Sequence, residues 1–146
     1  MKKEIVLATD HAGFDLKEEL KKYLIENNFS IKDFGAHEND STDDYPDFIM
    51  PAAEYITNNN TLGIIFGGSG QGEAMAANRF KGIRATVFYG GPMEIVELSR
   101  LHNNANVLSI AARFVSLEET IKVVNLWLSI DFEGGRHLAR IKKLDS

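Results

Sequence analysis

The chain alternates short apolar runs with longer amphipathic runs five times, and this alternation constrains its fold more than any other feature. The apolar runs have the length and β-branched content of strands, whereas the longer runs place apolar side chains at helical spacing. Predicted strands cover residues 4–9, 29–34, 61–66, 84–89 and 106–111, and predicted helices cover 13–27, 45–58, 72–79, 92–102 and 116–129. Such alternation favours a parallel sheet with helices on both faces. We therefore predict a three-layer α/β/α, doubly wound (Rossmann-like) fold around a five-stranded parallel sheet.

The chain has the size of one domain, since its 146 residues are enough to bury a substantial core. No internal repeat, low-complexity segment or linker divides it, and the acidic stretch 36–44 is its one sizeable predicted loop. Ser116 and Glu119 have the spacing of a capping box, which supports a helix start there. We expect residues 1–146 to form a single domain.

Composition and charge argue against several classes of function. The formal net charge is −5, and no cluster of Lys and Arg is long enough to grip a nucleic-acid backbone. No apolar run approaches the length of a membrane span, and the first residues do not resemble a secretory signal. The absence of Cys rules out disulfides and thiolate metal sites and fits a reducing compartment. We expect no nucleic-acid or membrane partner and a cytoplasmic location.

A glycine-rich loop, Gly67-Gly68-Ser69-Gly70-Gln71-Gly72, follows the third predicted strand, and Glu73 comes next, on its rim. Such a loop exposes several backbone N–H groups in one concave place, which suits an anion. Its spacing matches neither the dinucleotide-binding fingerprint nor a P-loop. A carboxylate beside an anion site is unfavourable unless it acts as a general base on a substrate whose negative charge develops there. The alternative is a tight turn without chemistry.

Ligands of a doubly wound sheet bind beyond the carboxyl ends of its strands. Asp10 and His11 end the first predicted strand and Arg113 follows the fifth, so we expect them beside the glycine loop. His102 and Asn103 end the fourth helix and join this group only if the next connection folds over the crevice. Structural roles are the alternative, such as helix entry for Asp10. The four His, at positions 11, 37, 102 and 137, lack metal-ligand spacing on one helix face, so no metal is expected.

The C-terminal segment places Arg136, His137 and Arg140 after a pair of glycines. Two Arg four residues apart lie on one helix face, and guanidinium groups bind phosphate in a bidentate manner. The alternative is a solvated basic end, because Lys and Arg favour helix C-termini. A helix beyond the last sheet helix, with glycines at its hinge, could reach a partner subunit and complete its site.

Six motifs, in this order, resemble the ribose-5-phosphate isomerase B family, which includes the galactose-6-phosphate isomerase subunits. They run nearly from end to end and begin at Asp10 (DHAGFDLK), Asp44 (DYPDF), Gly67 (GGSGQGEAMAANR), Gly82 (GIRA), Ser99 (SRLHNNANVL) and Glu133 (EGGRHLARI). One branch of the family uses a Cys at the first loop position, where this chain has Gly67. The other branch uses a Glu at the end of the loop, which falls on Glu73, and the chain resembles this branch.

The resemblance implies an aldose–ketose isomerase of the pentose phosphate pathway that converts ribose 5-phosphate to ribulose 5-phosphate through a cis-enediolate. His102, helped by Asp10, would open the sugar ring, and Glu73 would move a proton between carbons 1 and 2. The enediolate would be stabilised by the glycine loop, through Gly68, Ser69, Gly70 and Gly72, and by the side-chain amide of Asn103. The resemblance places Tyr45 in the sugar pocket and makes phosphate ligands of His11, Arg113 and, from the partner subunit, Arg136, His137 and Arg140.

The resemblance also implies that no cofactor or metal is needed and that the minimal active unit is a homodimer, alone or within a tetramer. Two alternatives stay open from the sequence. One is the same chemistry on a longer or shorter sugar phosphate, with segments 36–44 and 88–91 setting the sugar length. The other is a non-catalytic module that binds a sugar phosphate or nucleotide on the same sheet, although such a module has no use for a carboxylate beside an oxyanion site.

Overall fold

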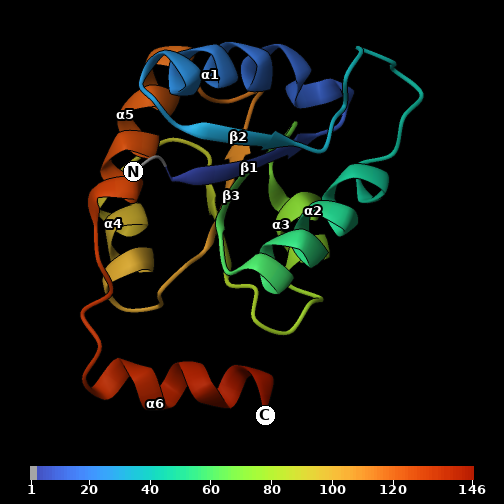
Figure 1. Cartoon of the computed structure of the whole chain (residues 1–146). Coiled ribbons are helices and arrows are strands. Elements are labelled where there is room, and N and C mark those ends of the chain that lie inside the picture. Colours follow the sequence, from blue (N-terminus) through green and yellow to red (C-terminus); the bar gives the residue numbers. More distant parts are fainter. Residues whose placement is uncertain (1–2) are drawn as a thin grey trace.

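The computed structural model describes residues 3–146, and these build one five-stranded sheet (Figure 1). The strands are β1 (Glu4–Thr9), β2 (Ser30–Asp33), β3 (Leu62–Gly67), β4 (Ala85–Phe88) and β5 (Val107–Ala111). All neighbouring strands pair in parallel, in the order β2-β1-β3-β5-β4. The predicted parallel sheet is confirmed, and each strand boundary lies within one residue of its predicted position.

Helices cover both faces of the sheet, so the predicted three layers are confirmed (Figure 1). One face carries α1 (Phe14–Glu26), α4 (Glu94–Leu101) and α5 (Leu117–Ser129), and the other carries α2 (Pro46–Asn59) and α3 (Gln71–Ala77). The chain ends in α6 (Arg136–Lys142) and the 3-10 turn η2 (Lys143–Asp145). A second 3-10 turn, η1 (His11–Gly13), was not predicted. Among the helices of residues 3–146, none is long and apolar enough to cross a membrane.

The strand side chains alternate between the two cores, because successive residues of a strand point to opposite faces. In β1, Ile5 and Leu7 pack with α1 and α5, whereas Val6 and Ala8 pack with α2. All four are fully buried. Burial on both faces explains why the strands read as continuous apolar runs, and it fixes the strand ends that carry the polar residues.

Helix α5 begins with the capping box that the sequence predicts. The Ser116 Oγ accepts a hydrogen bond from the Glu119 N–H at 3.1 Å, and the Ser116 N–H donates to the Glu119 Oε1 at 3.1 Å. These two bonds satisfy backbone donors that the first helical turn leaves unpaired. The helix therefore starts at a defined residue after β5.

A buried ion pair anchors the loop that follows β2, and the sequence analysis did not single it out. Lys17, on α1, is fully buried, and its Nζ lies 2.9 Å from both carboxylate oxygens of Asp33 and 2.7 Å from the Ala36 carbonyl oxygen. Burial alone would raise the pKa of Asp33. Hydrogen bonds from Lys17, the Gly35 N–H and Lys21 outweigh that effect and hold the pKa below its usual value.

We expect Lys17→Met to lower the free energy of unfolding by roughly 3 kcal/mol, because it leaves a buried carboxylate without its main partner. Urea denaturation followed by Trp127 fluorescence measures this loss. Lys21→Met is the matched control: the Lys21 side chain is 31% exposed, and exposed pairs contribute about 1 kcal/mol or less. Equal losses in the two variants would contradict the anchoring role of Lys17.

Candidate active site

The carboxyl ends of β1, β3 and β5 bring one group of predicted site residues together. Strand order reverses between β1 and β3, which is where doubly wound sheets bind ligands. Asp10 follows β1, is nearly buried, and accepts a hydrogen bond from the Ala12 N–H at 3.0 Å. The Arg113 N–H donates to the Gly68 carbonyl at 3.1 Å. The Tyr45 ring packs against Gly72. A β-carbon added to Gly72 would lie only 2.8 Å from the Tyr45 Cζ.

The glycine loop presents free backbone donors. Gly70 has a φ of +75°, a conformation that favours glycine, and its carbonyl accepts a hydrogen bond from the Ser109 Oγ at 2.7 Å. Within residues 3–146, the N–H groups of Gly68, Ser69 and Gly70 find no protein acceptor. The Ser69 hydroxyl accepts from the Gln71 N–H at 3.3 Å. Three unpaired donors in one tight loop are suited to holding an oxyanion.

Glu73 lies beneath this loop. It belongs to the first turn of α3 and is only 5% exposed, so its carboxyl group is shielded from solvent next to the loop. Its carboxylate fills the space in which a β-carbon of Gly67 would stand. Burial raises the pKa of Glu73, and nearby Asp10 raises it further, although the Glu73 N–H opposes this. A buried carboxyl group with a raised pKa is suited to general-base chemistry.

We expect Gly67→Ala to lower kcat for the sugar-phosphate isomerisation that the family resemblance implies, by about a hundredfold and with a much smaller effect on KM. The reason is that the new methyl group displaces the Glu73 carboxylate. Steady-state kinetics measures the loss. The double variant Gly67→Ala/Glu73→Gln tests whether the loss comes from displacement of Glu73. If it does, the double variant should be no slower than Glu73→Gln alone. A further loss in the double variant would mean that Gly67→Ala acts through something other than Glu73.

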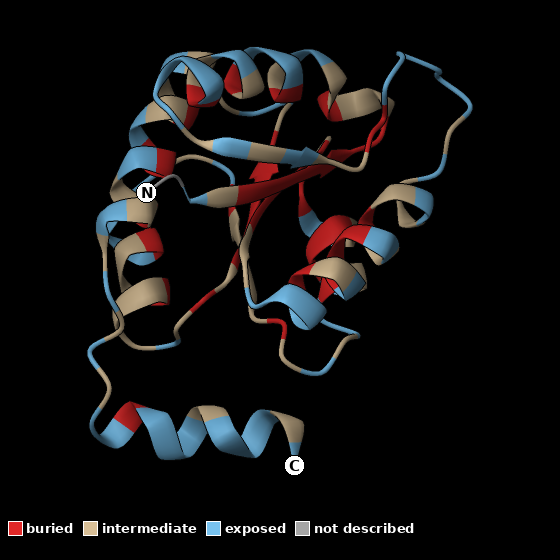
Figure 2. Ribbon diagram, in the orientation of Figure 1, coloured by how far each residue is buried: buried red, intermediate tan, exposed pale blue. Residues whose placement is uncertain are grey.

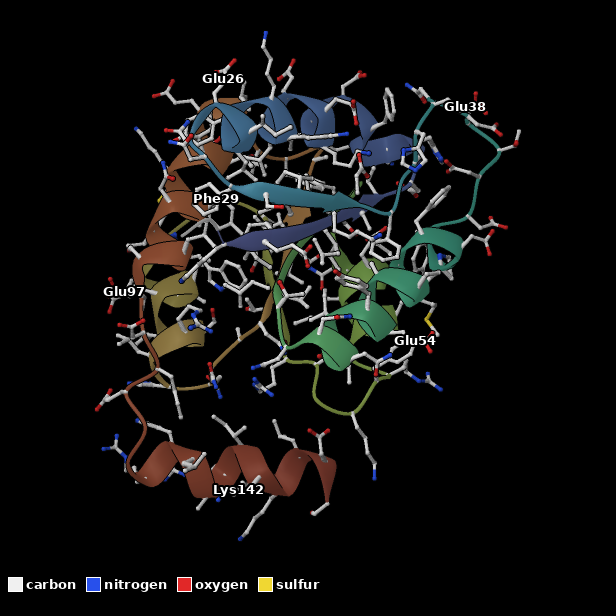
Figure 3. The ribbon with its side chains drawn as sticks, in the orientation of Figure 1. Glu26, Phe29, Glu38, Glu54, Glu97 and Lys142 are labelled. Carbon is white, nitrogen blue, oxygen red and sulfur yellow. The ribbon has the colours of Figure 1, made fainter. Side chains whose placement is uncertain are left out.

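His11 has a partner at this edge that the sequence analysis missed. Its backbone N–H and its ring Nδ1 lie 3.0 and 2.7 Å from one carboxylate oxygen of Asp43. Asp43 belongs to the loop between β2 and α2, which Glu38 marks in Figure 3. Its place beside the DYPDF motif was visible in the sequence, but nothing there indicated its contact with His11.

The structure places His102 and Asn103 at the other edge of the sheet. Helix α4 starts beyond the carboxyl end of β4 and returns to the amino end of β5, so its last turn lies at the amino edge. The prediction that these two residues could join Asp10 within one chain was therefore wrong. No fold of the following connection changes this, because a crossover between parallel strands must bring the chain back to the amino edge.

A second group of predicted residues gathers at this amino edge. The rings of His102 and His137 stack with centroids 4.3 Å apart, and the Glu133 Oε2 lies 3.6 Å from the His102 Nε2. His137 is buried; that burial, and then the neighbouring His102 and Arg136, lower its pKa. Arg136 and Arg140 are exposed on α6. Apart from His137, α6 is covered little by the rest of the chain (Figure 2).

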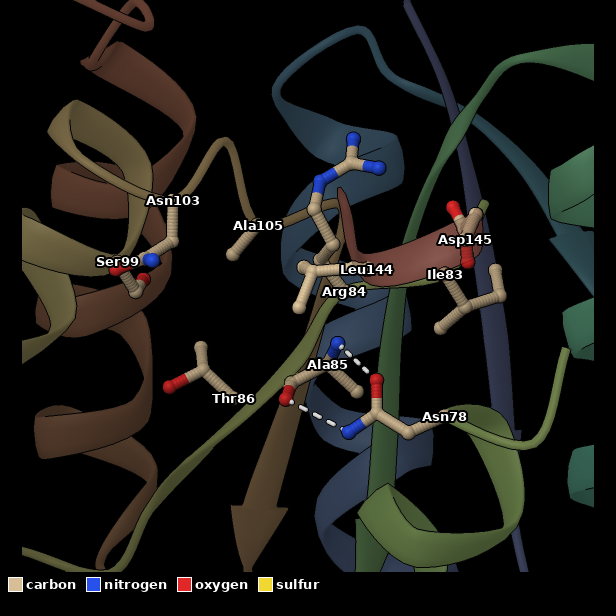
Figure 4. A pocket seen from close by; sticks show the side chains of 10 residues that line it. All are labelled: Asn78, Ile83, Arg84, Ala85, Thr86, Ser99, Asn103, Ala105, Leu144 and Asp145. Atoms are coloured by element: carbon tan, nitrogen blue, oxygen red, sulfur yellow. Dashed lines mark hydrogen bonds between the residues drawn. The ribbon is translucent and has the colours of Figure 1, made fainter. Parts of the chain in front are cut away.

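Asn103 lies beside a cavity of about 430 Å³ at the amino edge. The cavity opens between β4 and η2, and Thr86, Ser99 and Arg84 also line it (Figure 4). At its floor the Asn78 side chain bonds the N–H and carbonyl of Ala85 at 2.8 and 3.1 Å. This cavity and the buried Glu73 belong to different edges of the sheet, so the cavity does not hold the candidate base.

Among residues 3–146, two groups of His and acidic residues have ligand atoms within 4.8 Å of one another: His102 with Glu133 and His137, and His11 with Asp10 and Asp43. The rings of His102 and His137 are within 15° of parallel, so an ion in the plane of one ring lies outside the plane of the other. The His11 Nδ1 and the Asp43 Oδ1 are separated by 2.7 Å, so these two atoms are already joined by a hydrogen bond.

Comparisons with known proteins identify the family that shares this arrangement. The ribose/galactose isomerase family model matches residues 5–144. The chain belongs to this family. A family member from Mycoplasma genitalium, a probable ribose-5-phosphate isomerase B, is 41% identical over 142 residues, which cover 96% of this chain and 92% of that protein. The ribose-5-phosphate isomerase B of Escherichia coli is 38% identical and covers 97% of this chain and 94% of its own length.

Solved structures in the family have the same fold. A ribose 5-phosphate isomerase from Thermotoga maritima superposes with a TM-score of 0.93 at 38% identity, and the match covers 99% of both chains. The M. genitalium ribose-5-phosphate isomerase B, solved with bound ribulose-5-phosphate, superposes with a TM-score of 0.92 at 40% identity, covering 99% of this chain and 95% of that one. The predicted family and fold class are confirmed.

Proposed function

We propose that this protein interconverts ribose 5-phosphate and ribulose 5-phosphate through a cis-enediolate, with Glu73 as the base. The observation that carries the proposal is the buried Glu73 carboxylate next to a loop of unpaired N–H donors. An aldose–ketose isomerisation needs both a group that moves a proton between carbons 1 and 2 and a site for the charge on the oxygen. Family membership supports the same reaction.

Glu73 and the loop divide the chemistry between them. As an ionised carboxylate, Glu73 accepts the proton from carbon 2 and returns it to carbon 1, while the hydroxyl proton of oxygen 2 passes to oxygen 1. As that proton leaves, negative charge develops on the sugar oxygen, where the N–H groups of Gly68, Ser69 and Gly70 stabilise it without having to reorganise. Gly72, in the first turn of α3, and the Ser69 hydroxyl also belong to this site, and the Tyr45 ring forms a wall beside Gly72.

The substrate phosphate binds to His11 and Arg113. Both follow strands of the same edge, and the Arg113 charge acts to lower the pKa of His11, which supports their closeness. A cationic pair here fixes one end of the sugar and holds carbon 2 over Glu73. Such orientation can contribute several kcal/mol to catalysis.

A second copy of the chain completes the site. Within one chain the two groups lie at opposite edges, and α6, marked by Lys142, lies far from the 36–44 loop, marked by Glu38 (Figure 3). His102 and Asn103 therefore act in the partner's site together with Arg136, His137 and Arg140, and not with Asp10 of their own chain. This arrangement requires at least a homodimer. His102 helps the partner's Asp10 to open the sugar ring, and the two Arg bind phosphate.

The test is conversion of ribose 5-phosphate by purified protein in EDTA, with six-carbon and four-carbon aldose phosphates in parallel. The proposal expects turnover on ribose 5-phosphate, unaffected by EDTA, because the loop does the charge stabilisation. Turnover on another sugar alone would keep the mechanism and change the substrate. Binding without turnover on any sugar would favour a non-catalytic module. A cytoplasmic location is part of the proposal, and a chain without Cys suits it.

A further inference from the structure

Asp43 holds His11 at two points. One carboxylate oxygen, Oδ1, accepts both from the His11 backbone N–H at 3.0 Å and from the ring Nδ1 at 2.7 Å. The Asp43 side chain is only 10% exposed. Its other oxygen, Oδ2, is buried and has no partner among residues 3–146, so the carboxylate directs its hydrogen bonding at His11 alone.

This contact determines which hydrogen atoms the His11 ring carries. An ionised carboxylate only accepts hydrogen bonds, so a ring nitrogen 2.7 Å away must be protonated. The ring then offers its second nitrogen, Nε2, to other partners, and within residues 3–146 no side chain or backbone group bonds to it. The His11 side chain is 28% exposed, so that nitrogen is available to a ligand.

We infer that Asp43 is a positioning residue for the substrate phosphate: it fixes the His11 ring as an imidazolium whose Nε2–H donates to the phosphate. This inference rests on the proposed function, in which His11 binds the phosphate. A neutral His11 protonated on Nδ1 alone would instead turn a lone pair toward the anion. The nearby carboxylate prevents this, because it stabilises the doubly protonated ring.

The surroundings of His11 agree with a charged ring. The hydrogen bond to Asp43 raises its pKa most, partial burial lowers it, Asp10 and the Asp43 charge raise it, and Arg113 lowers it. The pKa of Asp40, in the same loop, lies below its usual value, mainly because of its bonds to Thr42, and His11 contributes to that shift. With a raised pKa, His11 carries its charge at lower pH and loses it as the pH rises through that value.

The test compares Asp43→Asn with wild type. Asn keeps the size and a hydrogen-bond acceptor but removes the charge, and Asp44→Asn is the matched control, because it removes an exposed charge next in the chain. An NMR titration of the His ring nitrogens reports the His11 pKa directly. The protein has only four His, so there are few ring signals to assign. Inorganic phosphate serves as the probe for the anion site, and its affinity is measured with the catalytic step absent.

We expect Asp43→Asn to lower the His11 pKa, to weaken inorganic phosphate binding about tenfold, and to raise KM for ribose 5-phosphate about tenfold, with kcat within about twofold of wild type. The rise in KM should be largest at pH values between the His11 pKa of the variant and that of wild type, where His11 is neutral in the variant and still charged in wild type. Asp44→Asn should match wild type in all four measurements. If Asp43→Asn matches wild type in His11 titration and phosphate affinity, the inference is wrong.

The proposed isomerase function and the inferred role of Asp43 can be contradicted independently of each other. If ribose 5-phosphate is not converted but Asp43→Asn still lowers the His11 pKa and phosphate affinity, the proposed function fails and the anion site stands. If the isomerase is active and Asp43→Asn lowers kcat with no change in KM or phosphate affinity, the inference fails. A thermal melt within about 2 °C of wild type shows that the variant is folded. Should Asp43→Asn unfold the protein, a wild-type KM that stays constant across the pH range in which His11 titrates would overturn the inference.

Discussion

We expect Glu73→Gln to lower kcat about a thousandfold and to leave KM nearly unchanged. Gln fills the same buried space beneath the glycine loop, so the loop donors and the phosphate ligands keep their places. It cannot accept the proton from carbon 2, and the barrier for that step rises. Steady-state kinetics on ribose 5-phosphate measures the loss, and Glu54→Gln, an exposed Glu on α2, is the control. A kcat within tenfold of wild type would remove Glu73 from the mechanism.

The proposed role of Glu73 predicts a lower pH limit for the activity of the wild-type enzyme. Glu73 must be ionised to act as a base, so activity is present above its pKa and is lost as the pH falls through it. Because burial raises that pKa, the acid limb of kcat/KM should lie above the ordinary range of a glutamate. Glu73→Gln should abolish this limb along with the activity, which separates it from a limb caused by unfolding.

Two inactive variants should restore activity when they share a dimer. The first is Glu73→Gln, and the second combines His102→Ala with Arg140→Ala. If each site takes Glu73 from one chain and His102 and Arg140 from its partner, a mixed dimer has one intact site and one doubly impaired site. Random mixing makes half of the dimers mixed, so about a quarter of wild-type activity should return.

Coexpression with two affinity tags gives the mixed dimers, and each variant expressed alone is the control. A mixture no more active than the better single variant would show that the two groups of residues act within one chain or not together. This experiment bears on the shared site and not on the identity of the sugar. It therefore complements substrate tests.

The sheet was predictable because its physical signal is local. Strands buried on both faces read as apolar runs, and helices buried on one face read as amphipathic runs, so β1 and α5 were located from residue spacing. The place of His102 was also available from the sequence. A helix between neighbouring parallel strands ends at the amino edge, and that rule contradicts a site shared with Asp10 in one chain.

Other features depend on contacts that sequence spacing does not specify. His11 and Asp43 are 32 residues apart, and their hydrogen bond depends on how the loop after β2 folds back. The stacking of His102 on His137 depends on the turn before α6. The burial of Glu73 depends on the missing side chain at Gly67, which the sequence records but whose consequence appears only when the loop is folded.

The most direct test of the account is isomerisation of ribose 5-phosphate in D₂O, followed by NMR of the product. Proton transfer through an enediolate lets the base exchange with solvent, so wild-type product should carry deuterium at carbon 1, and Glu73→Gln should give neither product nor exchange. Conversion at wild-type rate by Glu73→Gln would contradict the role of Glu73. Bound ribose 5-phosphate that neither converts nor exchanges its carbon-2 proton would contradict isomerisation itself.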